Sequence, residues 1–263
     1  MRSVTDSLGR CLSIPSWAER IISLCPSQTE TLFALGVGER IVGRTRYCIH
    51  PKGQIDSLPV VGGTKKVDVE MVQTLQPDLI IAQMEENSRE DVERLSGIAP
   101  VYVTKVESYE EALESIHRLG DITGKPTEAK YLVSEIEAAF APLKNLAKPK
   151  RVLYLTWRKP YIAAGKATYI DSIITLLGWI NEAHFLPGRY PTIEDPSLVS
   201  PEIVLLCDEP YPFKEKHIPE IQILWPRAEI YCVRGDYFCW YGSRMKEAAP
   251  YLKELVERIN KVA

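Results

Sequence analysis

Short apolar runs alternate with amphipathic stretches along most of the chain. The apolar runs lie at 20–24, 40–43, 77–82, 101–103, 151–156, 161–164, 201–206 and 228–233. They predict buried strands, because several are too apolar to have one face in water. The stretches between them repeat apolar residues every three or four positions, which predicts helices. The alternation predicts an α/β fold whose mainly parallel sheets are covered by helices on both faces.

One amphipathic stretch, residues 123–149, separates two series of such elements. Pro126 suits the first position of a helix, where its missing N–H would have no partner. The apolar face comprises Ala129, Leu132, Val133, Ile136, Phe140, Leu143 and Ala147. Because this stripe continues past Pro142, we expect that proline to bend the helix rather than end it. The pattern alone fits two arrangements, a helix that joins two lobes or an ordinary helix inside one large domain.

The two halves of the chain resemble each other locally. Residues 77–81 (Pro-Asp-Leu-Ile-Ile) match residues 201–205 (Pro-Glu-Ile-Val-Leu), and a glutamate stands seven positions before each proline, at Glu70 and Glu194. This repeat favours two similarly built lobes. We predict an N-terminal extension (1–19), an N-terminal lobe (20–122), a connecting backbone helix (123–149) and a C-terminal lobe (150–263).

Helix ends carry their own signals. Ser27 and Glu30 match a capping box, which predicts a helix that starts after Ser27. Asp68 is expected to cap another helix at its start, and Gly178 to end one.

Composition and charge narrow the classes of function. The chain has 263 residues, 45% hydrophobic and 25% charged, and these values predict a soluble globular protein long enough for two lobes. A net charge of -3 argues against a nucleic-acid partner. The six cysteines form no Cys-x-x-Cys pair, so free thiols in a reducing compartment are expected. The hydrophilic N-terminus lacks the apolar core of a secretory signal, which predicts a cytoplasmic location.

Candidate binding residues follow the predicted strands. Ligands of open α/β sheets sit beyond the carboxyl ends of the strands. Aromatic residues and arginines dominate the side chains found there, which are Ser27, Arg46, Tyr47, His50, Thr64, Glu85, Trp157, Arg158, Tyr211, Phe213, Asp236, Trp240, Tyr241 and Arg244. Rings offer stacking area and guanidinium groups pair with anions, so the set suits a large, flat or partly anionic ligand. Any single aromatic residue in the set fits a packing role equally well.

Signals for catalysis or metal binding are weak. The chain has neither a Gly-x-Ser-x-Gly elbow nor a Walker loop, and residues 61–65 (Val-Gly-Gly-Thr-Lys) fit a plain turn better than a phosphate loop. Cys48 and His50, with Glu85 or His184, are low-ranked candidates for a metal site, because no His-x-x-x-His or Cys-x-x-Cys spacing supports them. We therefore expect no enzyme activity, no resident metal and no cofactor.

The opening of the chain resembles a known family. Residues 20–30 (Arg-Ile-Ile-Ser-Leu-Cys-Pro-Ser-Gln-Thr-Glu), followed by Leu35-Gly36, are similar to the start of the class III substrate-binding proteins of ABC transporters. These are the cobalamin, haem and iron–siderophore receptors with a helical backbone. Further matches occur in the family's order, at Val42-Gly43, Tyr47, Pro51, 69–70, 77–82, Thr123-Gly124, Gly165, Leu177-Gly178 and 236–238. The resemblance runs from about residue 20 to the C-terminus and is nearest to the cobalamin-binding members.

The resemblance implies an arrangement and several roles. It implies two lobes joined by a rigid helix, a ligand clamped between them and little hinge closure. It also implies that acidic residues on the two lobes, here Glu70 and Glu194, dock onto arginines of a membrane permease. The family's aromatic contacts with the ligand fall on Tyr47 and on Phe238 or Trp240, and its polar contact falls on Asp236.

Two departures from the family pattern bear on ligand and location. Thr64 stands where cobalamin binders place a cleft tryptophan. Five arginines would suit an anionic ligand such as a ferric siderophore if they line the cleft, namely Arg44, Arg46, Arg158, Arg189 and Arg244. The missing export signal conflicts with a periplasmic or cell-surface role, which would hold if the signal is absent only from this chain.

These observations predict a monomeric solute-binding protein that holds a cobalamin-like or ferric siderophore-like chelate in an interlobe cleft for ABC-type uptake. The predicted ligand contacts are Arg46, Tyr47, Thr64, Glu85, Trp157, Arg158, Asp236, Phe238, Trp240 and Arg244. The alternative is a cytoplasmic corrinoid- or metal-handling protein or enzyme that uses Cys48, His50 and Glu85.

Overall fold

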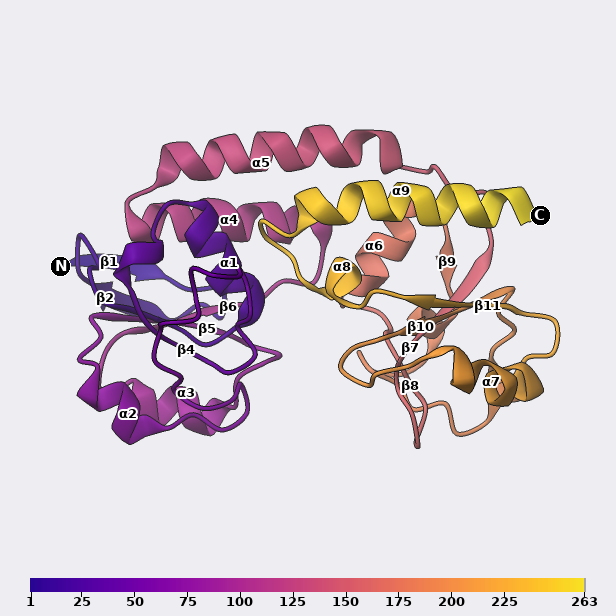
Figure 1. The fold of residues 1–263 in the computed structure, drawn as a ribbon, viewed down its shortest axis with the longest axis horizontal. Helices are drawn as coiled ribbons and strands as arrows, with labels where there is room; N and C mark the ends of the chain where they lie inside the picture. The colour runs from indigo at the N-terminus through magenta and orange to yellow at the C-terminus, as the bar shows by residue number, and fades with distance from the viewer. Residues whose placement is uncertain (263) are drawn as a thin grey trace. The chain divides into compact units, whose positions relative to one another are not determined.

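The computed structural model describes residues 1–262, which fall into two compact units. Unit 1 comprises residues 1–106, 111–136 and 242–244. Unit 2 comprises residues 107–110, 137–241 and those from 245 onward. Each unit contains its own sheet and its own helices (Figure 1).

Unit 1 is built on four parallel strands in the order β4-β3-β5-β6. These strands are β3 (Ile21–Ser23), β4 (Ile41–Arg44), β5 (Leu79–Gln83) and β6 (Val101–Thr104). Every residue of β3, β5 and β6 is buried, as expected for strands that are covered on both faces. The apolar runs predicted as strands in this half of the chain are confirmed.

Helices cover both faces of this sheet. They are α1 (Pro26–Ala34), α2 (Val69–Thr74), α3 (Arg89–Leu95), α4 (Tyr109–Thr123) and the first part of α5 (Pro126–Phe140). Helices α2 and α3 lie on one side of the strands, and α4 and α5 lie on the other (Figure 1). Apolar side chains from β3, β5, β6, α2 and α3 form one core, which includes Ile22, Ile80, Val103, Val72 and Leu95.

Of the two helix N-termini predicted in unit 1, one is confirmed and the other is wrong. Asp68 caps α2 as predicted, because its Oδ1 accepts the Met71 N–H at 3.0 Å. The capping box at Ser27 is wrong. Helix α1 begins at Pro26, two residues before the predicted start, and Cys25 precedes it without any side-chain cap. Pro26 takes the first helical position because it lacks the N–H that a cap would satisfy.

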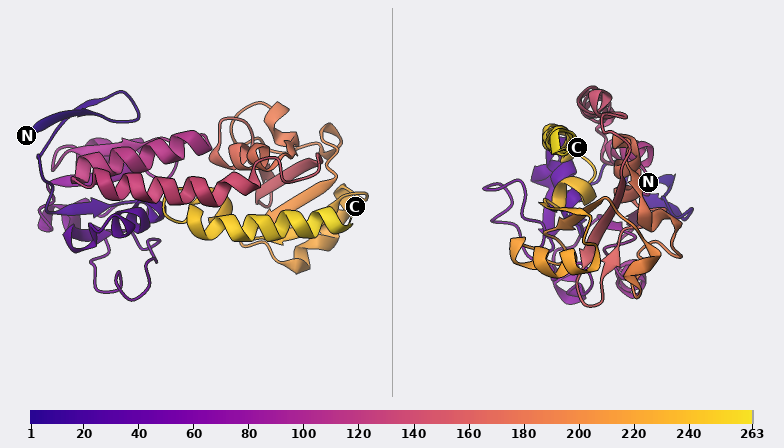
Figure 2. Two further views of the ribbon diagram at one scale, coloured as in Figure 1. Left: turned by 90° about the horizontal axis from the view of Figure 1, so that it is seen from above. Right: turned by 90° about the vertical axis from the view of Figure 1, so that its right-hand side faces the viewer.

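The predicted N-terminal extension contains a β-hairpin formed by β1 (Arg2–Thr5) and β2 (Cys11–Ile14) (Figure 2). Its turn is fastened to β6. The buried Asp6 carboxylate accepts the Val103 N–H at 3.3 Å and pairs with Arg10 at 2.6 Å, and the Arg10 guanidinium also donates to the Val101 carbonyl at 2.8 Å. The hairpin is therefore part of unit 1.

Unit 2 has a five-stranded sheet. Strands β7 (Arg151–Trp157), β10 (Ile203–Cys207) and β11 (Glu229–Val233) are parallel in the order β11-β10-β7. Strand β8 (Ile162–Ala163) pairs antiparallel with β7, and β9 (Ile180–Asn181) pairs parallel with it. The predicted strands are again confirmed, whereas the two-residue β9 was not predicted because it is too short to show a pattern.

The helices of unit 2 are α6 (Tyr169–Leu177), α7 (Ile218–Leu224), α8 (Asp236–Cys239) and α9 (Met245–Val262). Helices α6 and α9 lie on one side of the strands and α7 on the other (Figure 1). Gly178 ends α6 in the left-handed conformation (φ 99°), as predicted. The core between the sheet and α7 includes Leu153, Leu206, Phe213, Ile221 and Trp225.

The predicted helix at 123–149 is shorter than expected. Helix α5 ends at Phe140 and gives way to one 3-10 turn, Ala141–Leu143. The expectation that Pro142 would only bend the helix is wrong, because proline cannot donate to the helical ladder and crowds the preceding turn. Ala147 is nevertheless buried, since its N–H bonds the Leu177 carbonyl at 2.8 Å and so fastens an irregular segment to the end of α6. The predicted lobe boundaries and the rigidity of this connection stay predictions.

Within residues 1–262, no helix is both long enough and apolar enough to span a membrane.

Candidate functional site

A buried layer of polar side chains lies at the carboxyl ends of the strands in unit 1. The Thr29 hydroxyl donates to Ser23 Oγ at 2.7 Å, and the Gln28 amide donates to Thr104 Oγ1 at 3.1 Å. All four residues are at most 1% exposed. Buried polar groups are costly unless they are hydrogen-bonded, so these bonds hold α1 in a fixed place against the strand ends.

Cys48 belongs to this buried layer. Its Sγ lies 3.1 Å from Thr29 Oγ1 and 3.2 Å from Thr45 Oγ1, and its side chain has no exposed surface. Burial raises the pKa of the thiol, so Cys48 stays protonated at neutral pH. A protonated, enclosed thiol is neither a nucleophile nor a metal ligand.

The structure gives no support to the metal site considered for Cys48, His50 and Glu85. Across the part of the chain that the structure describes, no three His, Cys, Asp or Glu side chains lie together in a way that could hold a metal ion. His50 and Glu85 are half-buried.

Arg46 and Tyr47 lie together on the loop that follows β4. The Arg46 N–H donates to the Gly62 carbonyl at 2.9 Å, which pairs this loop with the glycine turn at 62–63. A Cβ atom placed on Gly63 would lie 3.4 Å from Tyr47 Cε2 and 3.8 Å from Arg46 Nε, so both side chains rest against that glycine. Tyr47 keeps 55% of its surface exposed, and Arg46 is exposed as well. Sequence reasoning missed the role of Gly63, although the Gly-Gly pair was a visible signal.

Thr64 and Glu85 lie on neighbouring loops of unit 1. The Asn87 side chain joins these loops, because it donates to the Thr64 carbonyl at 2.9 Å and accepts the Gln83 N–H at 2.8 Å. Lys65 adds a bond from its ammonium group to the Glu85 carbonyl. Thr64 is 6% exposed, so its side chain offers almost no surface to a ligand, while Glu85 is half-buried. Asn87 was not predicted, since nothing in its sequence context distinguishes it from other loop residues.

Aromatic side chains cluster after β7 and β10 in unit 2. The Trp157 ring stands edge-on to Tyr211, with 5.8 Å between ring centroids, and Tyr211 contacts Phe213 at 4.7 Å. His217 lies against both Tyr211 and Phe213. Trp157 is 41% exposed and Phe213 is buried. The cluster therefore presents the Trp157 indole on a base of packed rings.

Arg158, which follows Trp157, forms an ion pair with Glu220. The Glu220 carboxylate accepts from both Nε and Nη2 of Arg158, the latter at 2.7 Å, and accepts the Tyr161 hydroxyl at 2.9 Å. The hydrogen bonds between the two side chains, with a smaller contribution from their charges, raise the pKa of Arg158 and lower the pKa of Glu220 to about 2. Glu220 was missed because it lies on α7, 62 positions along the chain. Its carboxylate already neutralises the cation that was expected to attract an anionic ligand.

Asp236, at the start of α8, is paired as well. The Arg234 guanidinium donates to Asp236 Oδ2 at 2.6 Å and lies 4.0 Å from the centre of the Tyr237 ring. The Gly235 N–H donates to Asp208 Oδ1 at 2.7 Å, which ties this loop to the end of β10. Arg234 was not predicted, although a basic residue two positions before Asp236 was a local signal.

Phe238 and Trp240 differ in access. Phe238 has no exposed surface and packs on Tyr154, with 5.1 Å between ring centroids. The one-turn helix α8 directs the Phe238 ring into the core of unit 2, which gives no support to the predicted ligand contact, and that contact stays a prediction. Trp240 is half-buried and hydrogen-bonds the Glu209 carboxylate, whose pKa is raised by burial. Of these two alternatives, Trp240 is the residue with accessible surface.

Arg244 has a structural role in unit 1. Its side chain is 3% exposed and donates to both oxygens of Glu30, at 2.9 and 2.7 Å. The neighbouring Gly242 (φ 97°) lies so close to α1 that a Cβ atom there would be 2.1 Å from Thr31 Oγ1. Residues 242–244 are thus held against α1, which gives no support to the ligand contact predicted for Arg244, and that contact stays a prediction.

Two of the remaining arginines donate to backbone carbonyls. Arg44 Nε donates to the Ile55 carbonyl at 3.2 Å, and Arg189 Nε donates to the Ala167 carbonyl at 2.7 Å. Arg189 also lies 3.5 Å from the Glu107 carboxylate.

The two glutamates assigned to permease docking are both exposed. Glu70 lies in the first turn of α2 in unit 1. Glu194 lies in unit 2, where it lines a cavity of about 350 Å³ with Leu186, Pro191 and Leu198.

Comparison with known proteins finds a family that matches this chain. Residues 21–190, more than half of the chain, match the family described as periplasmic binding protein. The vitamin B12-binding protein of Vibrio cholerae serotype O1 is 26% identical over 239 residues, which cover 89% of this chain and 83% of the relative. The uncharacterized ABC transporter substrate-binding lipoprotein YvrC of Bacillus subtilis is 27% identical over 219 residues, or 78% and 69% of the two chains.

A solved structure from Staphylococcus epidermidis, described as a possible iron-binding (periplasmic solute-binding) protein, has a similar fold. It is 26% identical, with a TM-score of 0.76, and covers 92% of this chain and 98% of its own.

Proposed function

Because the chain belongs to the periplasmic binding protein family, we propose that it is a solute-binding protein that holds a bulky metal chelate for ABC-type uptake. The family and the relatives named above are binding proteins, and one of the relatives is described as a substrate-binding lipoprotein of an ABC transporter. The predicted placement of the ligand between two lobes is retained as a prediction.

Exposed aromatic side chains at the carboxyl ends of both sheets carry this proposal. Tyr47 in unit 1 and Trp157 in unit 2 keep 55% and 41% of their surface accessible, yet each is fixed by neighbours, Gly63 and Tyr211 respectively. Rings of this kind supply large contact area at low entropic cost. A chelate with a broad, flat face is the type of ligand that such rings bind best.

The ion pairs favour a cobalamin-like chelate over an anionic ferric siderophore. Four of the five arginines that suggested an anionic ligand already donate to carboxylates or carbonyls, which leaves Arg46 as the exposed member of that group. A polyanion would have to compete with these bonds. The Vibrio cholerae relative, which is named for vitamin B12, supports the same choice.

Optical titration tests the proposal. Purified protein is mixed with cyanocobalamin, hemin, a ferric hydroxamate or a ferric catecholate, and we expect cyanocobalamin to bind with a Kd on the order of 1 μM or below. Mass spectrometry should recover the ligand unchanged. Absence of binding to all four compounds, or chemical conversion of the bound one, would contradict the proposal.

Variants locate the contacts. Trp157→Ala and Tyr47→Ala should each weaken binding by about tenfold or more, because a stacked ring contributes ~1–3 kcal/mol. Trp17→Ala is the matched control, since Trp17 is 51% exposed but packs on Arg40, which precedes the amino end of β4. Unchanged affinity in Trp157→Ala would assign that residue to packing alone.

We further propose that Glu70 and Glu194 contact arginines of a membrane permease. Their exposure and their matching positions in the two halves of the chain support this role. Charge reversal in Glu70→Lys and Glu194→Lys should abolish chelate uptake by cells that carry the permease, without a change in chelate affinity. Glu90→Lys, at an exposed position of α3, is the control. Full uptake by the double variant would refute the docking role.

We also propose that the protein works in the periplasm or at the cell surface, as its family description implies. Fractionation of the native host with an antibody against this chain tests the location. Recovery in the cytoplasmic fraction alone would contradict it.

A further inference from the structure

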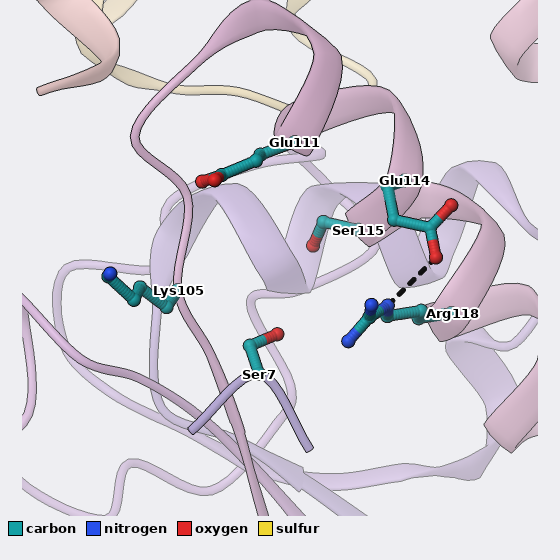
Figure 3. A pocket seen from close by; sticks show the side chains of 6 residues that line it. All are labelled: Ser7, Lys105, Glu111, Glu114, Ser115 and Arg118. Carbon is teal, nitrogen blue, oxygen red and sulfur yellow. Dashed lines mark hydrogen bonds and ion pairs between the residues drawn. The ribbon is translucent and has the colours of Figure 1, made fainter. Parts of the chain in front are cut away.

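A polar cavity of about 170 Å³ opens in unit 1, and none of the residues assigned to the chelate lines it (Figure 3). It is bounded by the turn of the N-terminal hairpin, the residue that follows β6 and one side of α4. Its lining consists of Ser7, Lys105, Glu111, Glu114, Ser115 and Arg118. All six side chains are polar or charged, so the cavity suits a small polar molecule.

Helix α4 supplies four of these residues at the spacing of a single helical face. Positions 111, 114, 115 and 118 follow the pattern i, i+3, i+4 and i+7. The helix packs with a different set of side chains, which includes Ala112, Ile116 and Leu119, all at most 1% exposed. The polar face is therefore not required for the packing of α4.

Ser115 provides the observation that points to a ligand. The residue is 4% exposed, and its hydroxyl oxygen has no hydrogen-bond partner in the protein. A buried hydroxyl without a partner destabilises the fold, whereas alanine at this position would not. In Figure 3 the hydroxyls of Ser115 and Ser7 and the guanidinium of Arg118 turn toward the same space. Ser7 and Arg118 also hydrogen-bond the Tyr102 side chain, so a ligand oxyanion would share these two donors with Tyr102 and would be the sole partner of the Ser115 hydroxyl.

The charges around the cavity restrict the ligand. Arg118 Nε donates to Glu114 Oε1 at 2.9 Å, so that face of the guanidinium is occupied by a carboxylate. Lys105 and Arg118 together balance Glu111 and Glu114, and the four lining charges sum to zero. A small ligand with a net charge would upset this balance, whereas a ligand that carries both signs would preserve it.

We propose that this cavity binds a small zwitterion of the α-amino acid class. The carboxylate of the ligand accepts from Arg118 and from the hydroxyls of Ser7 and Ser115, because a planar guanidinium matches a carboxylate in shape and charge. The ammonium group of the ligand faces Glu111. The volume of the cavity limits the ligand to a small side chain.

Titration of the full chain with glycine, acetate and methylammonium tests this inference. Backbone amide NMR signals of Ser7, Ser115 and Arg118 should shift in a saturable way with glycine, and acetate and methylammonium should bind at least about tenfold more weakly. Arg118→Gln should remove the response to glycine. The chelate titration should be unaffected, so failure of this inference and failure of the proposed function are distinguishable.

Ser115→Ala gives the sharpest outcome. It should lower the affinity for glycine by about tenfold or more, while the unfolding temperature of the ligand-free protein stays unchanged or rises. Ser134→Ala, at an exposed position of α5, should change neither quantity. If Ser115→Ala fails to fold, Ser7→Ala replaces it in the affinity measurement. A response to acetate equal to that of glycine, no saturation by about 100 mM glycine, or an unchanged affinity in these variants would overturn the inference.

Discussion

The carboxyl ends of the two sheets are held by different chemistry. In unit 1, neutral side chains bond one another below the surface, as in the contacts of Thr29 with Ser23 and of Gln28 with Thr104. In unit 2, the corresponding loops are fixed by partly exposed ion pairs, Arg158 with Glu220 and Arg234 with Asp236, and by packed rings. The difference predicts that the loops of unit 1 tolerate acid and salt, whereas those of unit 2 respond to both.

The largest effect is expected from an ion pair buried in unit 1, Arg244 with Glu30, which departs from this rule. Glu30→Leu leaves the Arg244 guanidinium buried and without its carboxylate, which should lower the free energy of unfolding by about 3–5 kcal/mol in chemical denaturation.

The double variant Glu30→Leu, Arg244→Met supplies the control, because it removes both charges. It should regain most of the lost stability, since apolar replacement of a buried pair is often neutral. A double variant as unstable as Glu30→Leu would show that the destabilisation comes from lost packing instead of an uncompensated charge.

A smaller effect is expected in the neutral layer of unit 1. Thr29→Val keeps the shape but removes the hydroxyl that hydrogen-bonds Ser23 and the Cys25 carbonyl, so it should cost about 1–3 kcal/mol of unfolding free energy. The loss should be the same at pH 7 and pH 5, because Thr29 and Ser23 do not titrate. Thr127→Val, exposed in α5, should cost less than about 0.5 kcal/mol.

Acid should act on unit 2 through Glu220. Its pKa is lowered to about 2 by Arg158, from an ordinary value of 4.5. Between pH 2 and pH 4.5, Glu220 is therefore protonated more in the unfolded chain than in the folded protein. The stability that the Glu220–Arg158 pair contributes is present above about pH 4.5 and is lost as the pH falls toward 2. In Glu220→Gln, the free energy of unfolding should decrease less steeply between pH 5 and pH 2 than it does in the unmodified protein. An unchanged slope would mean that the pair does not persist in solution.

The smallest effect is expected from salt. Raising the ionic strength to about 1 M shortens the screening length to ~3 Å and weakens the exposed Arg234–Asp236 pair. Amide hydrogen exchange in residues 234–239 should quicken modestly, while exchange near Thr29 and Ser23 stays constant. Equal changes in both regions would remove the contrast between the units.

The parts of the fold that follow from apolar patterning were predictable, and those that depend on short or irregular segments were not. The buried strands β5 and β10 are continuous apolar runs that only a covered sheet can accommodate. The N-terminal hairpin has half-exposed strands of four residues, which leave no periodic signal. The apolar stripe beyond Pro142 was mistaken for helix because an irregular segment that packs on α6 buries residues at similar spacing.

The predicted site shows the same limit. The positions of Tyr47 and Trp157 after strands could be read from the sequence, and both rings are accessible. The partners of the arginines could not, because Glu220 and Glu30 lie 62 and 214 positions away from Arg158 and Arg244. Phe238 shows a related failure, since a sequence does not tell which side chain of a one-turn helix points into the core.

The attachment of residues 242–244 to α1 has a consequence for synthesis of the protein. Unit 1 is not complete in the first half of the chain, because residues 242–244 belong to it and the Arg244 guanidinium that pairs with Glu30 is translated 214 positions later. A nascent chain that has emerged only as far as α5 has a sheet and its covering helices, but Glu30 in α1 still lacks its two hydrogen bonds from Arg244. The last step of folding for unit 1 must therefore wait until Arg244 has left the ribosome, when all the strands of unit 2 are already outside. A fragment that ends before residue 242 should consequently be less stable than unit 1 is in the full chain, even if its sheet is intact.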